Sequence, residues 1–250
     1  MDFSFYSVIE WMKIFVASSD AYSMWYYRRD ENLNKTLIAY EIAANDYEKK
    51  FINYNEYKKR IECFAKLFTK ESSILDAGCG PGLNSIIFSK MGLVVEGFDI
   101  SKQMVKLAMK NCPTGTFSVS SVENFITNKK YDGICLSFII VHLTKKETVS
   151  LILKIKDYIN DKGKVYISFM TGKAHGYETT SFSKKEIYFN YYEKDEIISL
   201  FVSRNFQLIS TDSAPYHEQN GDITEDVFLI FEYQSNGLEM SGSPNWRRYF

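Results

Sequence analysis

The fold is decided by one stretch of the chain, Ser73-Ile74-Leu75-Asp76-Ala77-Gly78-Cys79-Gly80-Pro81-Gly82-Leu83-Asn84. A short apolar run ends in an acid, and three glycines then alternate with other residues before a new apolar pattern starts. Alternate glycines allow a sharp turn and the close approach of a ligand, because no Cβ is in the way. The stretch therefore predicts a buried strand, a tight turn and the first residues of a helix.

The glycine pattern is D-x-G-x-G-x-G and differs from the dinucleotide fingerprint G-x-G-x-x-G. Measured from Gly78 and Gly80, the third glycine of that fingerprint would fall at Leu83. A second strand, predicted over residues 93–99, ends in Asp99. This acid lies about 20 residues after the loop, where a carboxylate can accept both hydroxyl groups of a ribose. A strand-end aspartate is often a helix N-cap instead, but Ser101 can serve as that cap, so we favour ribose binding.

This pattern resembles motif I of the class I S-adenosylmethionine (SAM)-dependent methyltransferases, whose glycine loop holds the methionine part of SAM. Three further stretches resemble the same family. Residues 43–47 are similar to its A-x-x-Y segment, residues 99–104 to D-x-S-x-x-M, and residues 131–143 to a fourth strand that continues to His-Leu. The resemblance covers about residues 38 to 233.

The resemblance implies an α/β fold, a Rossmann-like seven-stranded, mostly parallel sheet with helices on both faces and an N-terminal helical cap. It also implies SAM as the cofactor and S-adenosylhomocysteine as the product. The family's usual acid after the third strand is replaced here by Ser120-Ser121, so backbone groups at Val122 would have to recognise the adenine. Carried over residue by residue, the expected SAM-binding residues are Tyr47, Asp76, Gly78, Cys79, Gly80, Asn84, Asp99, Ile100, Met104, Ser121, Val122, Glu123, Ser137 and Phe138.

The expected domain organisation has three parts: a helical cap over residues 1–70, the SAM-binding domain over 71–233 and a tail over 234–250. Apolar spacing predicts cap helices over residues 1–20, 37–50 and 54–68, the second of them from Ile38, Ile42, Ala43 and Tyr47. A lid insertion is expected over residues 171–192, because most of this segment is polar and aromatic with little periodicity. Such a stretch inside a compact domain is usually functional or mobile.

Methyl transfer from a sulfonium is an in-line displacement, so the protein mainly has to align the reacting groups. A base is needed only if the acceptor must lose a proton, and a histidine can serve at neutral pH. We expect His142, at the end of the fourth strand, or His217 to be that base, with His175 as a rival; His142 could instead order its loop. The substrate-binding candidates are Tyr22, Trp25 and Tyr26, for which core packing is the alternative, together with His142, His175, Tyr216 and His217.

Composition argues against several classes of function. The chain has 30 basic and 31 acidic residues, which is not the basic footprint of a nucleic-acid binder.

The four cysteines of the chain are widely spaced, and residues 142–146 lack the acidic cluster of metal-dependent relatives, so we predict no metal. Residues 137–140 lack the Asn/Asp-Pro-Pro-Tyr/Phe tetrapeptide of enzymes that methylate base nitrogens or glutamine. No apolar run approaches the roughly 18 residues of a membrane span, and we expect a cytoplasmic protein.

The leading hypothesis is methyl transfer to an N or O atom of a small, aromatic or apolar molecule, without nucleic-acid or membrane partners. One alternative is an RNA or protein methyltransferase, in which paired basic residues would form a track. Another is a non-catalytic SAM-binding subunit of a complex. The N-terminal helix or the C-terminal tail could form a homodimer contact.

Overall fold

The structure, a computed structural model, describes residues 20–217, 221 and 223–235, and the side chains from residue 33 onward within these ranges. The helix predicted over residues 1–20 and nearly all of the predicted tail lie outside the described residues. The division into cap, domain and tail therefore stays a prediction.

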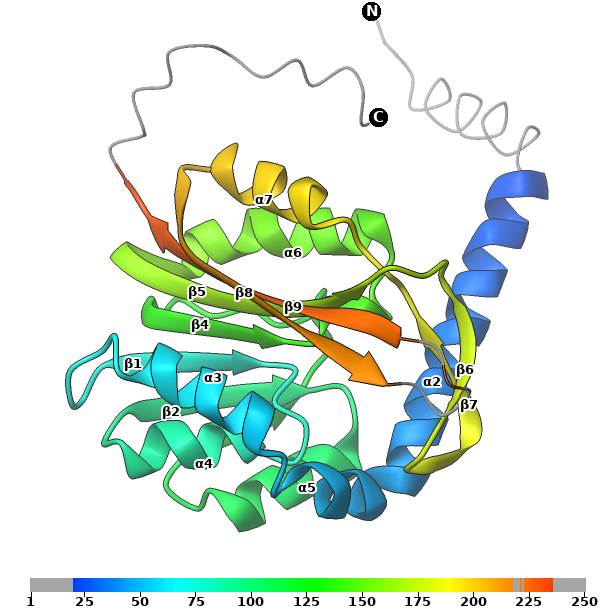
Figure 1. Cartoon of the computed structure of the whole chain (residues 1–250), viewed down its shortest axis with the longest axis horizontal. Helices are drawn as coiled ribbons and strands as arrows, with labels where there is room; N and C mark the ends of the chain where they lie inside the picture. Colours follow the sequence, from blue (N-terminus) through cyan, green and yellow to red (C-terminus); the bar gives the residue numbers. More distant parts are fainter. Residues whose placement is uncertain (1–19, 218–220, 222, 236–250) are drawn as a thin grey trace, which may run out of the picture.

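A seven-stranded sheet forms the centre of the molecule, in the order β3-β2-β1-β4-β5-β9-β8 (Figure 1). Every neighbouring pair from β3 to β5 is parallel, and only β9 runs antiparallel to its neighbours. This arrangement confirms the predicted Rossmann-like, mostly parallel sheet. Its strands are β1 (Ser73–Ala77), β2 (Val94–Asp99), β3 (Thr116–Val119), β4 (Tyr131–Ser137), β5 (Ile159–Thr171), β8 (Phe206–His217) and β9 (Ile223–Tyr233).

The predicted strand at the start of the glycine stretch is β1, which lies in the middle of the parallel part. Its Asp76 is in register with Gly97 of β2 on one side and with Cys135 of β4 on the other. The strand order reverses between β1 and β4, so a crevice forms at the carboxyl ends of these strands. The loops that end β1, β2 and β4 therefore meet at one edge of the sheet.

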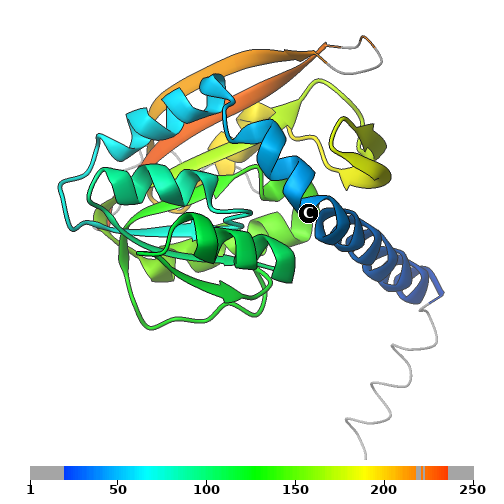
Figure 2. The same cartoon turned by 90° about the horizontal axis from the view of Figure 1, so that it is seen from below.

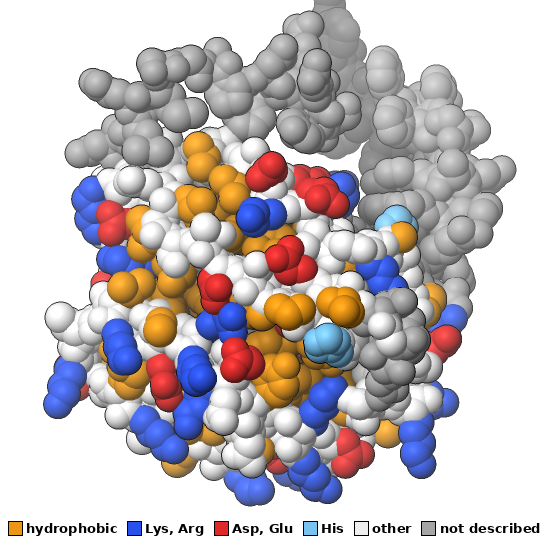
Figure 3. All heavy atoms as spheres, viewed as in Figure 1, with side chains coloured by type: hydrophobic (Ala, Val, Ile, Leu, Met, Phe, Trp, Pro, Cys, Tyr) orange, Lys and Arg blue, Asp and Glu red, His pale blue; other side chains and the backbone are white. Residues whose placement is uncertain are grey.

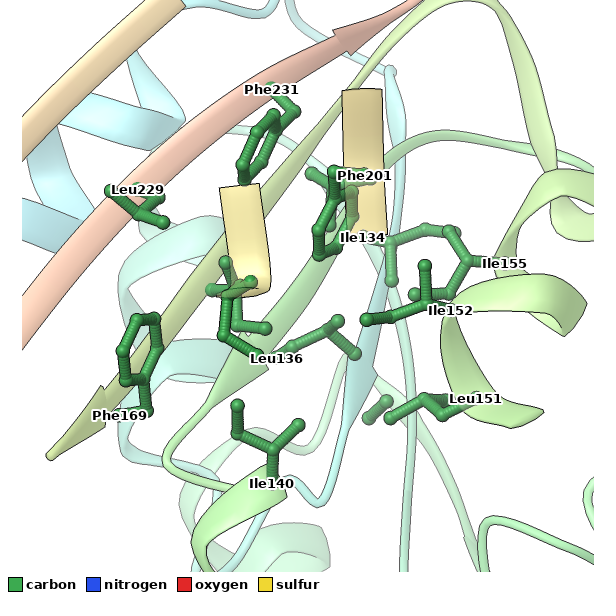
Figure 4. Packing of buried hydrophobic residues seen from close by; sticks show 14 of the residues in the cluster. Ile134, Leu136, Ile140, Leu151, Ile152, Ile155, Phe169, Phe201, Leu229 and Phe231 are labelled. Carbon is green, nitrogen blue, oxygen red and sulfur yellow. The ribbon is translucent and has the colours of Figure 1, made fainter. Parts of the chain in front are cut away.

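Helices cover both faces of the sheet, each over its own apolar core. The helices α3 (Asn55–Ala65), α4 (Leu83–Lys90) and α5 (Lys102–Asn111) lie on one face, where Ile61, Phe64 and Phe88 are buried. The helices α6 (Lys145–Tyr158) and α7 (Lys194–Val202) lie on the other. There Phe201 stacks on Phe231 of β9 with ring centroids 4.2 Å apart (Figure 4).

The long helix α2 (Asp20–Phe51) runs along one side of the molecule and extends beyond the sheet (Figures 1 and 2). It begins well before the predicted residue 37, and only part of the predicted apolar pattern is buried. Ile38 and Ile42 are 53% and 67% exposed, whereas Ala39 and Ala43 are buried. The small alanines allow close packing, and the aromatic residues of the helix take the place expected for the isoleucines.

Residues 171–190, expected to lack regular structure, contain a hairpin of β6 (Gly176–Thr180) and β7 (Ser183–Phe189). The backbone N–H of Tyr188 donates a 3.1 Å hydrogen bond to Thr36 Oγ1, which attaches the hairpin to α2. Strand β8 extends to His217 and so includes Tyr216 and His217, two of the predicted substrate-binding candidates. In the part of the chain that the structure describes, no helix is both long and apolar enough to cross a membrane.

Candidate active site

A pocket of about 250 Å³ opens at the carboxyl ends of β1, β2 and β4. It is bounded by the glycine loop, by α2 and by the β6–β7 hairpin, at the place where open α/β sheets bind their ligands. The predicted site residues that line it are Tyr47, Gly78, Gly80, Asp99, Ile100, Met104, Ser121, Val122, Glu123, Ser137, Phe138, His142 and Tyr216.

The glycine loop is held against β2 by its own backbone. The N–H groups of Gly78 and Cys79 both donate to the carbonyl oxygen of Phe98, at 2.8 and 2.9 Å. A Cβ on Gly78 would lie 2.8 Å from Ile139 Cδ1, so the loop packs too closely there for a side chain. A Cβ on Gly80 would meet nothing within 4 Å. Gly80 lines the pocket, so this open space is available to a ligand.

Asp99 ends β2 with its carboxylate at the pocket wall. Its Oδ1 accepts the N–H of Ser101 and its Oδ2 accepts the N–H of Gly80, each at 2.9 Å. Burial raises the pKa of Asp99, and these two N–H donors counteract that rise. Each carboxylate oxygen can accept more than one hydrogen bond, so capacity remains for hydroxyl groups of a ligand. As predicted, Ser101 is the helix cap, since its Oγ accepts the N–H of Met104 at 3.1 Å.

The far end of the pocket is aromatic. Tyr47 and Phe51 come from α2, Tyr57 from α3 and Phe182 from the turn between β6 and β7. Tyr47 and Phe182 meet edge to face with centroids 5.1 Å apart, and Tyr57 lies 5.1 Å from Phe138. Phe138 follows β4 with φ 53°, a left-handed conformation that is strained for a non-glycine residue and typical of functional sites.

A polar pair lies among these rings. The hydroxyl of Tyr57 donates a 2.6 Å hydrogen bond to Oδ2 of Asp226, which is 2% exposed and lines the pocket. Burial, followed by the charge and hydrogen bond of Asp226, raises the pKa of Tyr57. The pocket therefore has a carboxylate at each end, Asp99 beside the glycine loop and Asp226 beneath the aromatic rings.

Comparisons with known proteins agree with this geometry. A family model described as "Methyltransferase domain" matches residues 48–211. The chain belongs to this family, the class I SAM-dependent methyltransferases. An uncharacterized methyltransferase of Alkaliphilus oremlandii is 27% identical over 189 residues, which are 76% of this chain and 80% of the relative.

Solved structures share the fold of this methyltransferase. A SAM-dependent methyltransferase from Methanosarcina mazei has a TM-score of 0.61 at 14% identity, over 69% of this chain and 97% of that one. The N-methyltransferase NodS of Bradyrhizobium japonicum, in complex with S-adenosylhomocysteine, has a TM-score of 0.56 at 8% identity, over 73% and 87% of the two chains. At these identities the likeness shows the fold alone.

His142 of the methyltransferase lies in the short 3-10 helix η1 (Ile140–His142), directly after β4. Its Nε2 is 2.9 Å from the hydroxyl of Tyr40, and its Nδ1 is 3.2 Å from the carbonyl oxygen of Tyr188. Burial lowers the pKa of His142 from 6.5 to about 4, so the ring is neutral at physiological pH. The predicted base therefore faces the pocket in its unprotonated form, paired with a tyrosine that the sequence analysis did not name.

Three predicted SAM-binding residues lie behind the pocket wall instead of in it. Asp76 is fully buried, and its Oδ2 accepts the hydroxyl proton of Ser85 at 2.6 Å. Burial raises the pKa of Asp76 to about 6. Cys79 belongs to the core under α4, and Asn84 lies 3.8 Å from the sulfur of Cys135. These residues connect the glycine loop to the core, and a direct role with the cofactor stays a prediction.

The other substrate candidates lie away from the described pocket wall. His175 and His217 are exposed and do not line the pocket. Tyr22, Trp25 and Tyr26 belong to α2, but their side chains lie outside the described residues. Among the described residues no three His, Cys, Asp or Glu side chains gather as a metal site would require, and the prediction that no metal is used stays untested.

Sequence reasoning missed several residues of the pocket: Tyr40, Phe51, Tyr57, Phe182 and Asp226. Part of the signal was present, because Tyr40, Tyr47 and Phe51 are spaced by seven and four residues and so share one helix face. Phe182 had no such signal, since it reaches the pocket only through the turn of the hairpin.

Proposed function

We propose that the chain transfers a methyl group from SAM to an N or O atom of a small, aromatic or apolar molecule. The observation that carries this proposal is the aromatic end of the pocket, which Tyr47, Phe51, Tyr57 and Phe182 line together with the glycine loop. An apolar chamber with a few polar groups is typical of a small-molecule site. A folded protein or RNA segment would need an open surface in its place.

The residues around the glycine loop fit SAM. Gly80 leaves open space where a Cβ would stand, and Asp99 offers carboxylate oxygens to the two ribose hydroxyls. Ile100 and Met104 supply apolar surface for the adenine, with backbone groups at Val122 beside it. When bound, SAM supplies a methyl group on a positively charged sulfur that is already activated for displacement.

Beyond binding SAM, the residues of this chain mainly have to align the acceptor with the methyl group. The strained Phe138 lines the pocket with its ring 5.1 Å from that of Tyr57, so it can contact an aromatic acceptor. The helix α2 and the hairpin line the chamber with aromatic side chains such as Tyr47 and Phe182. Holding two reactants in line is the principal source of rate enhancement that such a site can supply.

The described surface gives the RNA and protein alternatives no separate support. On the face seen in Figure 3, Lys and Arg side chains are interspersed with acidic ones and do not gather into one track. Among the described residues several basic side chains form ion pairs, such as Lys129 with Glu96 at 2.6 Å. Steeply salt-dependent binding of bulk RNA would favour the RNA alternative.

Two measurements test the proposed function. Calorimetry should show saturable binding of SAM, and labelled SAM offered with a panel of phenols and aromatic amines should give a methylated small molecule. Methylation of RNA or protein without any small-molecule product would contradict the proposal. SAM binding by the isolated chain without methyl transfer to any acceptor would favour the non-catalytic subunit.

A further inference from the structure

Tyr40 and His142 form a hydrogen-bonded pair at the pocket wall, although they come from distant elements. Tyr40 belongs to α2 and His142 to the turn after β4, and both line the pocket. Tyr40 Oη and His142 Nε2 are 2.9 Å apart, and the two rings meet edge to face with centroids separated by 5.1 Å. The pair thus joins the helical cap to the strand end at which an acceptor would be methylated.

The third member of this chain of hydrogen bonds determines its direction. His142 Nδ1 is 3.2 Å from the carbonyl oxygen of Tyr188, and a carbonyl oxygen can only accept. Nδ1 therefore carries the proton of the neutral imidazole, which leaves a lone pair on Nε2. Tyr40 must then donate its hydroxyl proton to Nε2. In this arrangement His142 has no lone pair left for a substrate, whereas the oxygen of Tyr40 can still accept a proton.

Both members of the pair are neutral before the reaction. Burial lowers the pKa of His142 to about 4 and raises the pKa of Tyr40 well above 10, the latter with contributions from Tyr47 and Asp99. Because both rings are neutral, neither can attract a negatively charged acceptor electrostatically. The pair can only take over a proton from an acceptor that becomes more acidic as its new bond forms.

We propose that Tyr40 is a catalytic residue that relays the proton of the acceptor to His142, an inference that rests on the proposed function. The acceptor X–H bond breaks and its proton passes to Tyr40 Oη, while the hydroxyl proton of Tyr40 passes to His142 Nε2. The electron pair on X forms the new bond to the methyl carbon, and the leaving sulfur keeps the pair of the broken S–C bond. The positive charge lost at sulfur reappears on the imidazolium.

The surroundings suit this exchange of charge. The total charge of the chamber does not change during the step, so no net charge has to be created in a buried site. The imidazolium keeps its Nδ1–H bond to the carbonyl oxygen of Tyr188, and the carboxylate of Asp99 lies within electrostatic reach of Tyr40. A base exposed to solvent would lack the stabilisation by the Tyr188 carbonyl and the Asp99 carboxylate. Such a base could pass its proton to water and would not need a relay.

The first test uses nuclear magnetic resonance of the histidine rings and needs no acceptor. In selectively labelled protein, His142 should show the Nδ1–H form with an unprotonated, hydrogen-bonded Nε2. The variant Tyr40→Phe keeps the ring but removes the donor, so the Nε2 resonance should move while the Nδ1–H form remains. An Nε2 resonance that is the same in wild type and Tyr40→Phe would overturn the proposal.

The second test measures turnover of whichever phenol or amine of the panel the wild type methylates. In Tyr40→Phe we expect kcat to fall about 100-fold or more, within the usual range for general-base catalysis, with the Kd for SAM unchanged within about twofold. The rate decrease that the wild type shows in D2O should disappear in the variant. Tyr54→Phe is the matched control, because Tyr54 is a nearby tyrosine outside the pocket wall.

The outcomes separate the relay from the proposed function. If Tyr40→Phe methylates the same acceptor at the wild-type kcat with the same effect of D2O, the relay is wrong and the proposed function stands. If neither protein binds SAM, the proposed function itself fails. A change in KM alone would assign Tyr40 to packing around the acceptor and would also overturn the relay.

Discussion

The backbone N–H of Gly80 donates a hydrogen bond of 2.9 Å to Oδ2 of Asp99. This contact joins the loop after β1 to the end of the neighbouring strand β2, and it fixes the carboxylate against the glycine turn. The two features that the sequence analysis expected to bind the methionine part and the ribose of SAM are thus one connected unit. Their separation and orientation are fixed by a hydrogen bond of the chain itself.

Replacing Asp99 by asparagine should weaken SAM binding. The change keeps the shape but removes the charge, and hydrogen bonds to charged groups are worth about 1.5–3 kcal/mol. We expect the Kd for SAM to rise by about 10- to 100-fold in calorimetry. Asp157→Asn, an exposed position on α6, makes the same chemical change away from the pocket. An equal Kd in both variants would remove Asp99 from the cofactor site.

A comparison of Gly80→Ala with Gly172→Ala separates the cost of backbone strain from the loss of space for the ligand. Gly80 has φ 51° and Gly172 has φ 94°, and a Cβ meets nothing within 4 Å at either position. A left-handed alanine costs roughly 1–2 kcal/mol, so both variants should lose about that much free energy of unfolding. Only Gly80→Ala should also weaken SAM binding, because only its methyl group enters the pocket.

The two measurements for this pair are denaturant unfolding and calorimetry with SAM. If Gly172→Ala weakened SAM binding as much as Gly80→Ala, the loss of affinity would come from backbone strain in the fold and not from the methyl group that enters the pocket at residue 80. If Gly80→Ala bound SAM like the wild type, the open space beside Gly80 would not be the place of the cofactor.

The sheet and its ligand edge could be predicted from the sequence because their signals are local. The glycine stretch, Asp99 and the Ser101 cap each carry their meaning within a few residues, and the structure places them as expected. Parallel strands buried on both faces also appear as short apolar runs. Once these were assigned, the carboxyl edge of the sheet followed from topology.

The acceptor end of the pocket could not be predicted in the same way. Tyr40, Phe182 and Asp226 come from α2, the hairpin turn and β9, and only tertiary structure brings them together. The hairpin itself was missed because Tyr177, Glu178 and their neighbours are half-exposed, so the alternation that marks a strand is weak. Exposed Ile38 and Ile42 also misled the assignment of the buried face of α2.

His142 should make the stability of the protein depend on pH. Its pKa is lowered from 6.5 to about 4 by burial, so between these values the unfolded chain binds more protons than the folded one. Stability from the neutral ring is complete above pH 6.5 and is lost as the pH falls toward 4, by ~3 kcal/mol at most. Asp76, with its pKa raised to about 6, acts in the opposite direction over much of this range.

The contribution of His142 is therefore measured as a difference. Urea unfolding of the wild type and of His142→Gln, from pH 7 to pH 4, should show an advantage of the wild type that shrinks as the pH falls. The Asp76 contribution cancels because both proteins contain it. His175→Gln makes the same change at an exposed position outside the pocket. A difference between wild type and His142→Gln that stays constant with pH would contradict the burial of His142.

The hydrogen bond between Tyr57 and Asp226 should couple the stability contributions of α3 and β9. A double-mutant cycle of Tyr57→Phe and Asp226→Asn isolates this pair from the other contacts of each side chain. Because the 2.6 Å bond has a charged acceptor and a nearly fully buried carboxylate, we expect a coupling energy of about 1.5–3 kcal/mol in urea unfolding. Tyr54→Phe with Asp226→Asn is the matched cycle, since Tyr54 lies beside Tyr57 with ring centroids 4.5 Å apart. Equal coupling in the two cycles would mean that Asp226 acts on both tyrosines through its charge and not through a hydrogen bond to the Tyr57 hydroxyl.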